Sequence, residues 1–119
     1  MVLIALAGLM GASGVVLAAA GAHAAPGTGL DSAAYILLFH ATAVLGGVAL
    51  VQQNVLWRPI MVFVLAAWVL GAVLFSSDIV LRALAGSRLF PMAAPTGGII
   101  LIAARIGVAA AAIGALMRS

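Results

Sequence analysis

Few side chains in this sequence could do chemistry, and Arg105 is the most informative of them. It stands about ten residues into a strongly apolar stretch near the carboxyl terminus. If that stretch crosses a membrane, Arg105 lies roughly 15 Å from either end at 1.5 Å per residue. A charged side chain that faces lipid at this depth costs at least about 2.5–3.5 kcal/mol. We therefore expect Arg105 to face the other helices, a partner protein or water.

Three roles for Arg105 follow from the polar groups within its reach. In the first, it is a structural clamp that binds backbone carbonyls or the polar residues near the end of a neighbouring helix, which are Ser76, Ser77 and Asp78. In the second, it lines a path for transport or proton relay together with His40, which we expect at a similar depth. In the third, it contacts a lipid phosphate or a partner chain.

The sequence shows no arrangement typical of catalysis or of a metal site. Cysteine is absent, which excludes disulfides and thiolate chemistry. A zinc site normally needs three or four ligands, whereas His23 and His40 are the only histidines and are expected at different depths. We expect His23 to bond the last free carbonyls of its own helix. The protein is therefore predicted not to be an enzyme and to hold no metal or cofactor.

The composition identifies lipid as the solvent of most of the chain. Of the 119 residues, 67% are hydrophobic and 6% are charged, whereas a soluble domain is about half apolar and a quarter charged. The five arginines are scattered, so the net charge of +3 does not indicate nucleic-acid binding. At about 20 residues per span, the length allows four spans. We predict an all-α integral membrane protein with four transmembrane helices in an up-down bundle with short loops.

Turn-forming and polar residues divide the chain into four spans within one domain, residues 1–119. The run Pro26-Gly27-Thr28-Gly29 ends the first span, and Asp31 or Ser32 is expected to cap the second helix. The run Gln52-Gln53-Asn54 ends the second span. The predicted spans are about 1–24, 31–51, 57–78 and 96–117, the last of them beginning after Pro91 and Pro95.

Residues 79–94 allow two interpretations. They either continue the third helix past the bilayer or lie along the interface with Arg82 and Arg88 reaching outward, and we favour the continuation. The basic residues set the predicted orientation. Arg58, Arg118 and the terminal amine share one side, which places both termini in the cytoplasm of a multi-pass protein, for example in an inner membrane.

Small residues recur at four-residue spacing in two predicted spans. Such rows let helix backbones approach closely in lipid. They either pack the helices within one bundle, which we favour, or form a face between molecules. The row members are Gly14, Ala18 and Ala22 in the first span, and Gly107 and Ala111 in the fourth.

Several short motifs carry a resemblance to a known family. They are Gly21-Ala22-His23, Tyr35 with Phe39-His40-Ala41, Gly71-x-x-Leu74-Phe75-Ser76 and Pro95-x-Gly97-Gly98. In their order and spacing they resemble the small membrane proteins of domain of unknown function 423 (DUF423), which are related to transmembrane protein 256. The resemblance implies a four-helix integral membrane protein without an established biochemical activity. It also draws attention to the motif positions Gly21, His23, Tyr35, His40, Phe75, Ser76, Pro95, Gly97 and Gly98.

The sequence departs from the family pattern at two places. After Phe75-Ser76 the family usually has a Gly-Ser pair and an aromatic residue, where this chain has Ser77 and Asp78. An aromatic residue is also usual in the family at the position of Arg105. If Asp78 and Arg105 form an ion pair, the two departures compensate each other.

Two functions remain open at this stage. The first is a non-enzymatic membrane protein that acts by association, as an accessory subunit or a self-assembling bundle. Its partners would be the lipid bilayer and either copies of itself or a larger membrane complex. The alternative is a small pore or transporter for a proton, an ion or a lipid-like molecule that uses Arg105 and His40.

Overall fold

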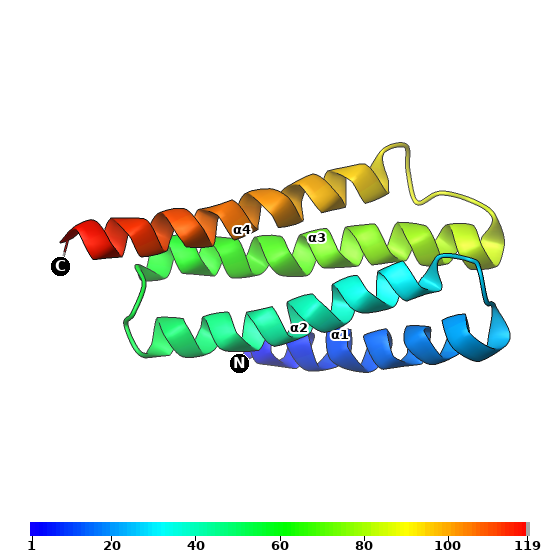
Figure 1. The fold of residues 1–119 in the computed structure, drawn as a ribbon, viewed down its shortest axis with the longest axis horizontal. Coiled ribbons are helices and arrows are strands. Elements are labelled where there is room, and N and C mark those ends of the chain that lie inside the picture. Colours follow the sequence, from blue (N-terminus) through cyan, green and yellow to red (C-terminus); the bar gives the residue numbers. More distant parts are fainter. Residues whose placement is uncertain (119) are drawn as a thin grey trace.

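Four antiparallel helices make up the computed structural model, which describes residues 1–118 (Figure 1). Each is long and apolar enough to cross a membrane, with 23, 23, 28 and 26 residues in chain order. The described residues contain no strand, which confirms the predicted all-α class. The elements are α1 (Val2–Ala19) with its π-helical continuation η1 (Ala20–Ala24), α2 (Leu30–Gln52), α3 (Arg58–Ala85) and α4 (Ala93–Arg118).

The segment 79–94 is divided between two helices and a loop. Helix α3 runs on past Asp78 to Ala85 and ends at Gly86, whose left-handed backbone (φ 70°) lets its amide donate to the Arg82 carbonyl at 3.1 Å. The loop then covers residues 86–92. Helix α4 begins at Ala93, three residues before the predicted start, because Pro95 falls in the first turn, where amide hydrogens have no partner within the helix.

The start of α2 also differs from the prediction. Gly29, with a φ of 87°, is the N-cap residue, and no side chain bonds the free amides of the first turn. The predicted cap at Asp31 or Ser32 is therefore wrong. Asp31 lies inside the first turn instead, where a negative charge is favourable beside the positive end of the helix dipole.

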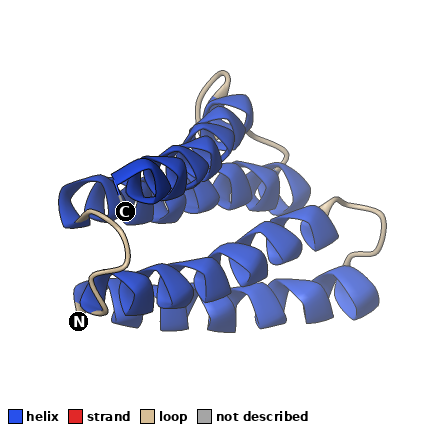
Figure 2. Ribbon diagram, turned by 60° about the vertical axis from the view of Figure 1, so that its left-hand side comes forward, coloured by secondary structure: helices blue, strands red, loops and turns tan. Residues whose placement is uncertain are grey.

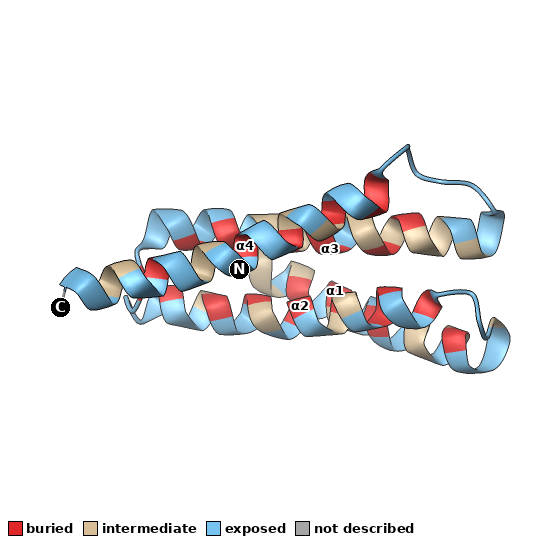
Figure 3. Ribbon diagram, turned by 45° about the horizontal axis from the view of Figure 1, so that its top comes forward, coloured by how far each residue is buried: buried red, intermediate tan, exposed pale blue. Residues whose placement is uncertain are grey.

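The helices form an open arrangement in which the two middle helices are the centre. Helix α1 packs mainly on α2, α2 packs on α3, and the α4 backbone approaches α3 alone. Figures 1 and 2 show α4 crossing over α3 on the side away from α1. The outer helices therefore bury one narrow stripe each, and most of their surface is exposed (Figure 3). Exposed apolar side chains on these helices fit a lipid environment.

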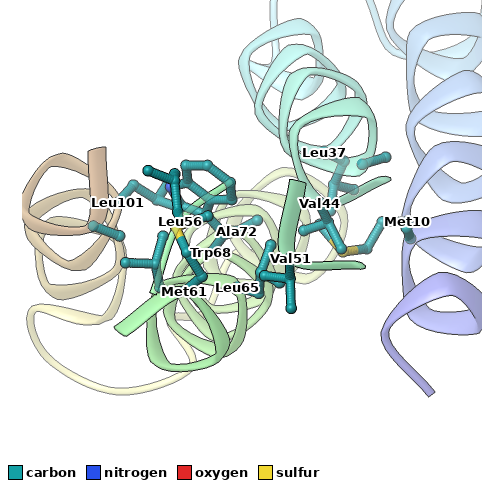
Figure 4. Close-up of a cluster of buried hydrophobic side chains, with 14 of the residues drawn as sticks. Met10, Leu37, Val44, Val51, Leu56, Met61, Leu65, Trp68, Ala72 and Leu101 are labelled. Carbon is teal, nitrogen blue, oxygen red and sulfur yellow. The ribbon is translucent and has the colours of Figure 1, made fainter. Parts of the chain in front are cut away.

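A continuous apolar core links the four helices through α2 and α3. Met10 of α1, Val44 of α2, Leu65 and Trp68 of α3 and Leu101 of α4 are all buried in it (Figure 4). The core extends from the middle of the helices to the 53–57 loop, where Val51, Leu56 and Met61 belong to it.

Glycines set the closest approach between helices. An added Cβ at Gly97 would lie 2.7 Å from the carbonyl oxygen of Gly71 and 2.8 Å from the amide nitrogen of Phe75. A Cβ at Gly71 would in turn lie 3.0 Å from the carbonyl oxygen of Gly97. Helices α3 and α4 therefore cross with their backbones in direct contact at these two residues.

The small-residue rows lie partly on contacts within the chain. A Cβ at Gly14 would lie 2.7 Å from the Leu38 side chain, and one at Gly107 would lie 3.3 Å from Val64. Ala18 is half-buried, whereas Ala22 is exposed. The π-helical turn η1 accounts for the difference, because its wider turn rotates the following residues and brings Gly21 against the Asp31 side chain instead of Ala22. In α4, Ala111 is buried.

The glycine crossing gives a first prediction. We expect Gly97→Ala to lower the free energy of unfolding by about 1–3 kcal/mol, because backbone atoms of α3 cannot move aside as a side chain can. The measurement is unfolding in mixed detergent micelles followed by circular dichroism. Gly98→Ala is the matched control, since its Cβ would meet only the Phe75 side chain, at 3.9 Å. Equal stability of the two variants would contradict a backbone contact at Gly97.

Candidate functional site

Arg105 is exposed near the middle of α4, about 18 Å along the helix from Ala93. Its guanidinium carbon lies 4.8 Å from the ring centroid of Trp68 on α3. It makes no hydrogen bond or ion pair with any other residue of the described chain, 1–118. The contact of Arg105 with protein is therefore a cation–π interaction, which contributes about 2 kcal/mol or more when it is desolvated.

The crossing of α3 and α4 explains why Arg105 meets Trp68. Arg105 is eight residues beyond Gly97, about 12 Å along α4 from the contact with Gly71. Trp68 precedes Gly71 by one turn on the antiparallel helix, so it lies in the same direction from the crossing. Long side chains on a helix point back toward its amino terminus, which directs Arg105 toward Trp68.

Trp68 is buried between α2 and α4. A Cβ at Gly47 of α2 would lie in ordinary contact with its ring, at 3.6 Å, and would clash with the Leu65 side chain, so α2 packs directly against this part of α3. The Nε1–H group of Trp68 is buried and has no acceptor within the described chain. Its ring thus presents one face to Arg105 while its hydrogen-bond donor is unused.

His40 of α2 is the third member of this group. Its Nδ1 lies 2.8 Å from the Ile36 carbonyl oxygen, so Nδ1 carries the proton and donates it. The other nitrogen, Nε2, is buried without a partner among the described residues. The ring meets Trp68 edge-on with 6.3 Å between centroids. We call the three residues the Arg105–Trp68–His40 stack.

The stack borders a groove between α2 and α4. The groove has a volume of about 290 Å³, opens to the outside of the helices and has mostly apolar walls. Both His40 and Arg105 line it, although the backbones of α2 and α4 do not approach each other. The remaining lining residues are Ile36, Phe75, Gly98, Leu101 and Ile102. The structure thus brings together the two residues that the sequence placed at similar depth.

Asp78 does not pair with Arg105, which corrects the sequence-based hypothesis of a compensating ion pair. Its Oδ2 lies 3.3 Å from Nη2 of Arg82, one turn further along α3, and its Oδ1 accepts the Leu89 amide at 3.0 Å. Asp78 lies seven residues beyond Gly71 toward the 86–92 loop, and Arg105 lies in the opposite direction from the crossing. At 1.5 Å per residue the two are separated by about 20 Å along the helices.

The two serines next to Asp78 also do not reach Arg105. The Ser76 hydroxyl donates to the Ala33 carbonyl at 3.2 Å and ties α3 to α2. Ser77 lines a second, apolar groove of about 750 Å³ between α1 and α3. The clamp predicted from Ser76, Ser77 and Asp78 is therefore a set of separate contacts, none of them with Arg105.

The other motif positions contact a neighbouring helix, line the groove or lie at the surface. Gly97 forms the α3–α4 crossing, and Phe75 and Gly98 line the groove beside the stack. Tyr35 is exposed and stacks on Phe39 with 6.1 Å between ring centroids. His23 is exposed in η1, where it is the basic residue of the last turn. Within residues 1–118 no three His, Asp or Glu side chains are grouped as metal ligands would be.

Trp68 is the site residue that sequence reasoning missed. A signal for it was present, because Trp68 stands ten residues inside a span, where an interfacial tryptophan does not belong. Counted from the start of α3, it lies about 15 Å deep, close to the depth of Arg105. A tryptophan at the depth of a membrane-embedded arginine is a candidate cation–π partner.

Comparisons with known proteins give one match. The model of a protein family described as "Protein of unknown function (DUF423)" matches residues 17–98. The matched region includes His40, Trp68 and the α3–α4 crossing, and it ends before Arg105. Neither the curated proteins nor the solved structures yield a match.

The Asp78 contacts give a second prediction. Asp78→Ala removes the acceptor of the Leu89 amide, and hydrogen bonds to charged groups contribute about 1.5–3 kcal/mol. We expect the Leu89 amide to exchange with solvent deuterium about tenfold faster or more, as followed by hydrogen exchange in micelles. Asp78→Asn keeps an oxygen acceptor and should retain most of the protection. Unchanged exchange in the alanine variant would show that Asp78 does not hold the loop.

Proposed function

The chain belongs to the DUF423 family of proteins of unknown function, and we propose that it is a non-enzymatic membrane protein that acts by association. In this proposal the protein is an accessory subunit or a self-assembling unit whose partner binds the exposed face of α4 around Arg105. The observation that carries the proposal is the exposed guanidinium in the middle of a span.

The energetics of Arg105 support a missing partner. Facing lipid at this depth costs at least about 2.5–3.5 kcal/mol, and a cation–π contact on one side offsets about 2 kcal/mol of that cost. The guanidinium has five hydrogen-bond donors, and none of them has an acceptor in the described chain. A partner that supplies acceptors would remove the remaining cost.

The open arrangement of the helices supports association as well. Helix α4 approaches a single helix, so most of its length is available to another protein. The loops at residues 25–29, 53–57 and 86–92 are too short to form a soluble domain. Interactions of this protein would therefore take place largely within the membrane.

The alternative function, a small pore or transporter, is favoured by the shared groove of His40 and Arg105. Against it stand the small volume of this groove and its mostly apolar lining. A transporter would show flux in proteoliposomes that His40→Ala lowers, whereas an association protein would show no flux above that of empty liposomes.

The proposed orientation has both termini in the cytoplasm. Because the four helices alternate in direction, the two termini and the 53–57 loop lie on one side, together with Arg58 and Arg118. On the other side Arg82 and Arg88 are the basic residues, and Arg82 is paired with Asp78.

Native mass measurement tests the association. We expect the wild-type protein, extracted with its surrounding lipid in polymer-bounded particles, to have a mass above the 11.8 kDa of a single chain. Arg105→Leu should reduce the mass to that of one chain while leaving the fold intact, because leucine is favourable in lipid. Native mass spectrometry measures both.

Arg118→Leu is the matched control for this experiment. It removes an exposed arginine from the end of the same helix, where the side chain can reach the interface, and should keep the complex. A single 11.8 kDa chain in the wild type, or an unchanged mass in Arg105→Leu, would contradict the proposal.

A further inference from the structure

We infer that the partner at Arg105 is a transmembrane helix of a different protein, carrying an Asp or Glu side chain at mid-membrane depth and seated along the groove between α2 and α4. The inference rests on the proposed function and specifies the chemistry of the partner. It is carried by the donors of the stack, by their depth, by the acidic residues of the chain and by the shape of the groove.

The stack has more hydrogen-bond donors than acceptors, and its one free acceptor, Nε2 of His40, bonds to neither Arg105 nor Trp68. The Arg105 guanidinium has no acceptor in the described chain, and the buried Trp68 Nε1–H has none either. A carboxylate accepts two parallel bonds from a guanidinium and neutralises its charge. No neutral side chain does both, so a carboxylate is the best chemical complement.

The depth of Arg105 restricts the origin of that carboxylate. Arg105 lies about 18 Å from the first residue of α4 and a similar distance from the last. Lipid phosphates lie at the edges of a hydrocarbon layer about 30 Å thick, and backbone carbonyls of a spanning helix are occupied by its own hydrogen bonds. The acceptor must therefore be a side chain of another helix at mid-span.

A second copy of this chain cannot provide that side chain. The sequence has two acidic residues, Asp31 and Asp78. Asp31 lies in the first turn of α2, at the end of the helices, and Asp78 is buried and bound to Arg82 and to the Leu89 amide. A symmetric pairing of two copies through this face of α4 would also bring two Arg105 side chains together.

The surface beside Arg105 has the shape of a helix seat. Gly98, Ile102 and Arg105 follow one another at four- and three-residue spacing, so they form one stripe of α4. Gly98 has no side chain, and only Phe75 would come within 4 Å of a Cβ there. A partner helix can therefore approach α4 closely next to the charge, with Ile36 and His40 of α2 on its other side.

A synthetic helix provides a direct test. The probe is a 23-residue leucine–alanine helix with lysine ends and one central glutamate, compared with otherwise identical helices carrying glutamine or leucine there. The protein carries a fluorophore on a cysteine introduced by Gln53→Cys, since the chain has no other cysteine. Energy transfer in phosphatidylcholine vesicles then reports binding. We expect the wild type to bind the glutamate helix at least about tenfold more tightly than the leucine helix.

Variants of the protein sharpen the test. Arg105→Leu should bind the three helices equally, and Gly98→Leu should weaken binding of the glutamate helix by filling the seat. Arg105→Glu should reverse the preference, so that it binds a helix with a central lysine more tightly than one with a central glutamate. Arg118→Leu should bind as the wild type does. The reversal shows that a lost signal is not simply a failure to fold.

The outcomes separate this inference from the proposed function. Equal binding of the glutamate and leucine helices by the wild type would overturn the inference. Displacement of the glutamate helix by oleate, a carboxylate carried by a lipid chain, would overturn it as well. A native mass that is a multiple of 11.8 kDa and depends on Arg105 would also overturn it, while leaving association itself supported. A native mass of one chain would count against the proposed function only, because binding of the probe helix is measured without the natural partner.

Discussion

The backbone contact between Gly71 and Gly97 is the constraint on which the rest of the structure depends. It fixes where α4 crosses α3, and no side chain lies between the two backbones to allow another register. From that point Trp68 and Arg105 lie in one direction along the helix pair, and Asp78 with the 86–92 loop lies in the other. The crossing therefore decides that Arg105 meets an aromatic ring and not a carboxylate.

The four spans could be predicted from the sequence because lipid imposes strict requirements on composition and length. Apolar runs of about 20 residues, interrupted by Pro26-Gly27 or Gln52-Gln53, leave few other solutions. Helix ends were less predictable. Pro95 marked a boundary in the sequence, yet it fits inside the first turn of α4, and Gly29 begins α2 without a side-chain cap.

The site was only partly predictable. Depth counting brought His40 and Arg105 to the same level, and both line one groove. The partner of Arg105 was not predictable in this way, because it depends on the direction and register of the α3–α4 crossing. Opposite charge suggested that Arg105 pairs with Asp78, whereas Asp78 pairs with Arg82 and accepts a hydrogen bond from the Leu89 amide. Composition alone cannot show which of two residues on one helix lies beyond the crossing point.

The open packing has a consequence for how the chain assembles in the membrane. Most contacts between helices join sequence neighbours, α1 with α2, α2 with α3, and α3 with α4. Contacts of this kind close short loops, which favours rapid folding. The first hairpin can pack before the second has been synthesised, and no later helix has to insert between two that are already packed. Helix α4 docks on one neighbour alone, so a long helical face stays exposed after all four helices have packed.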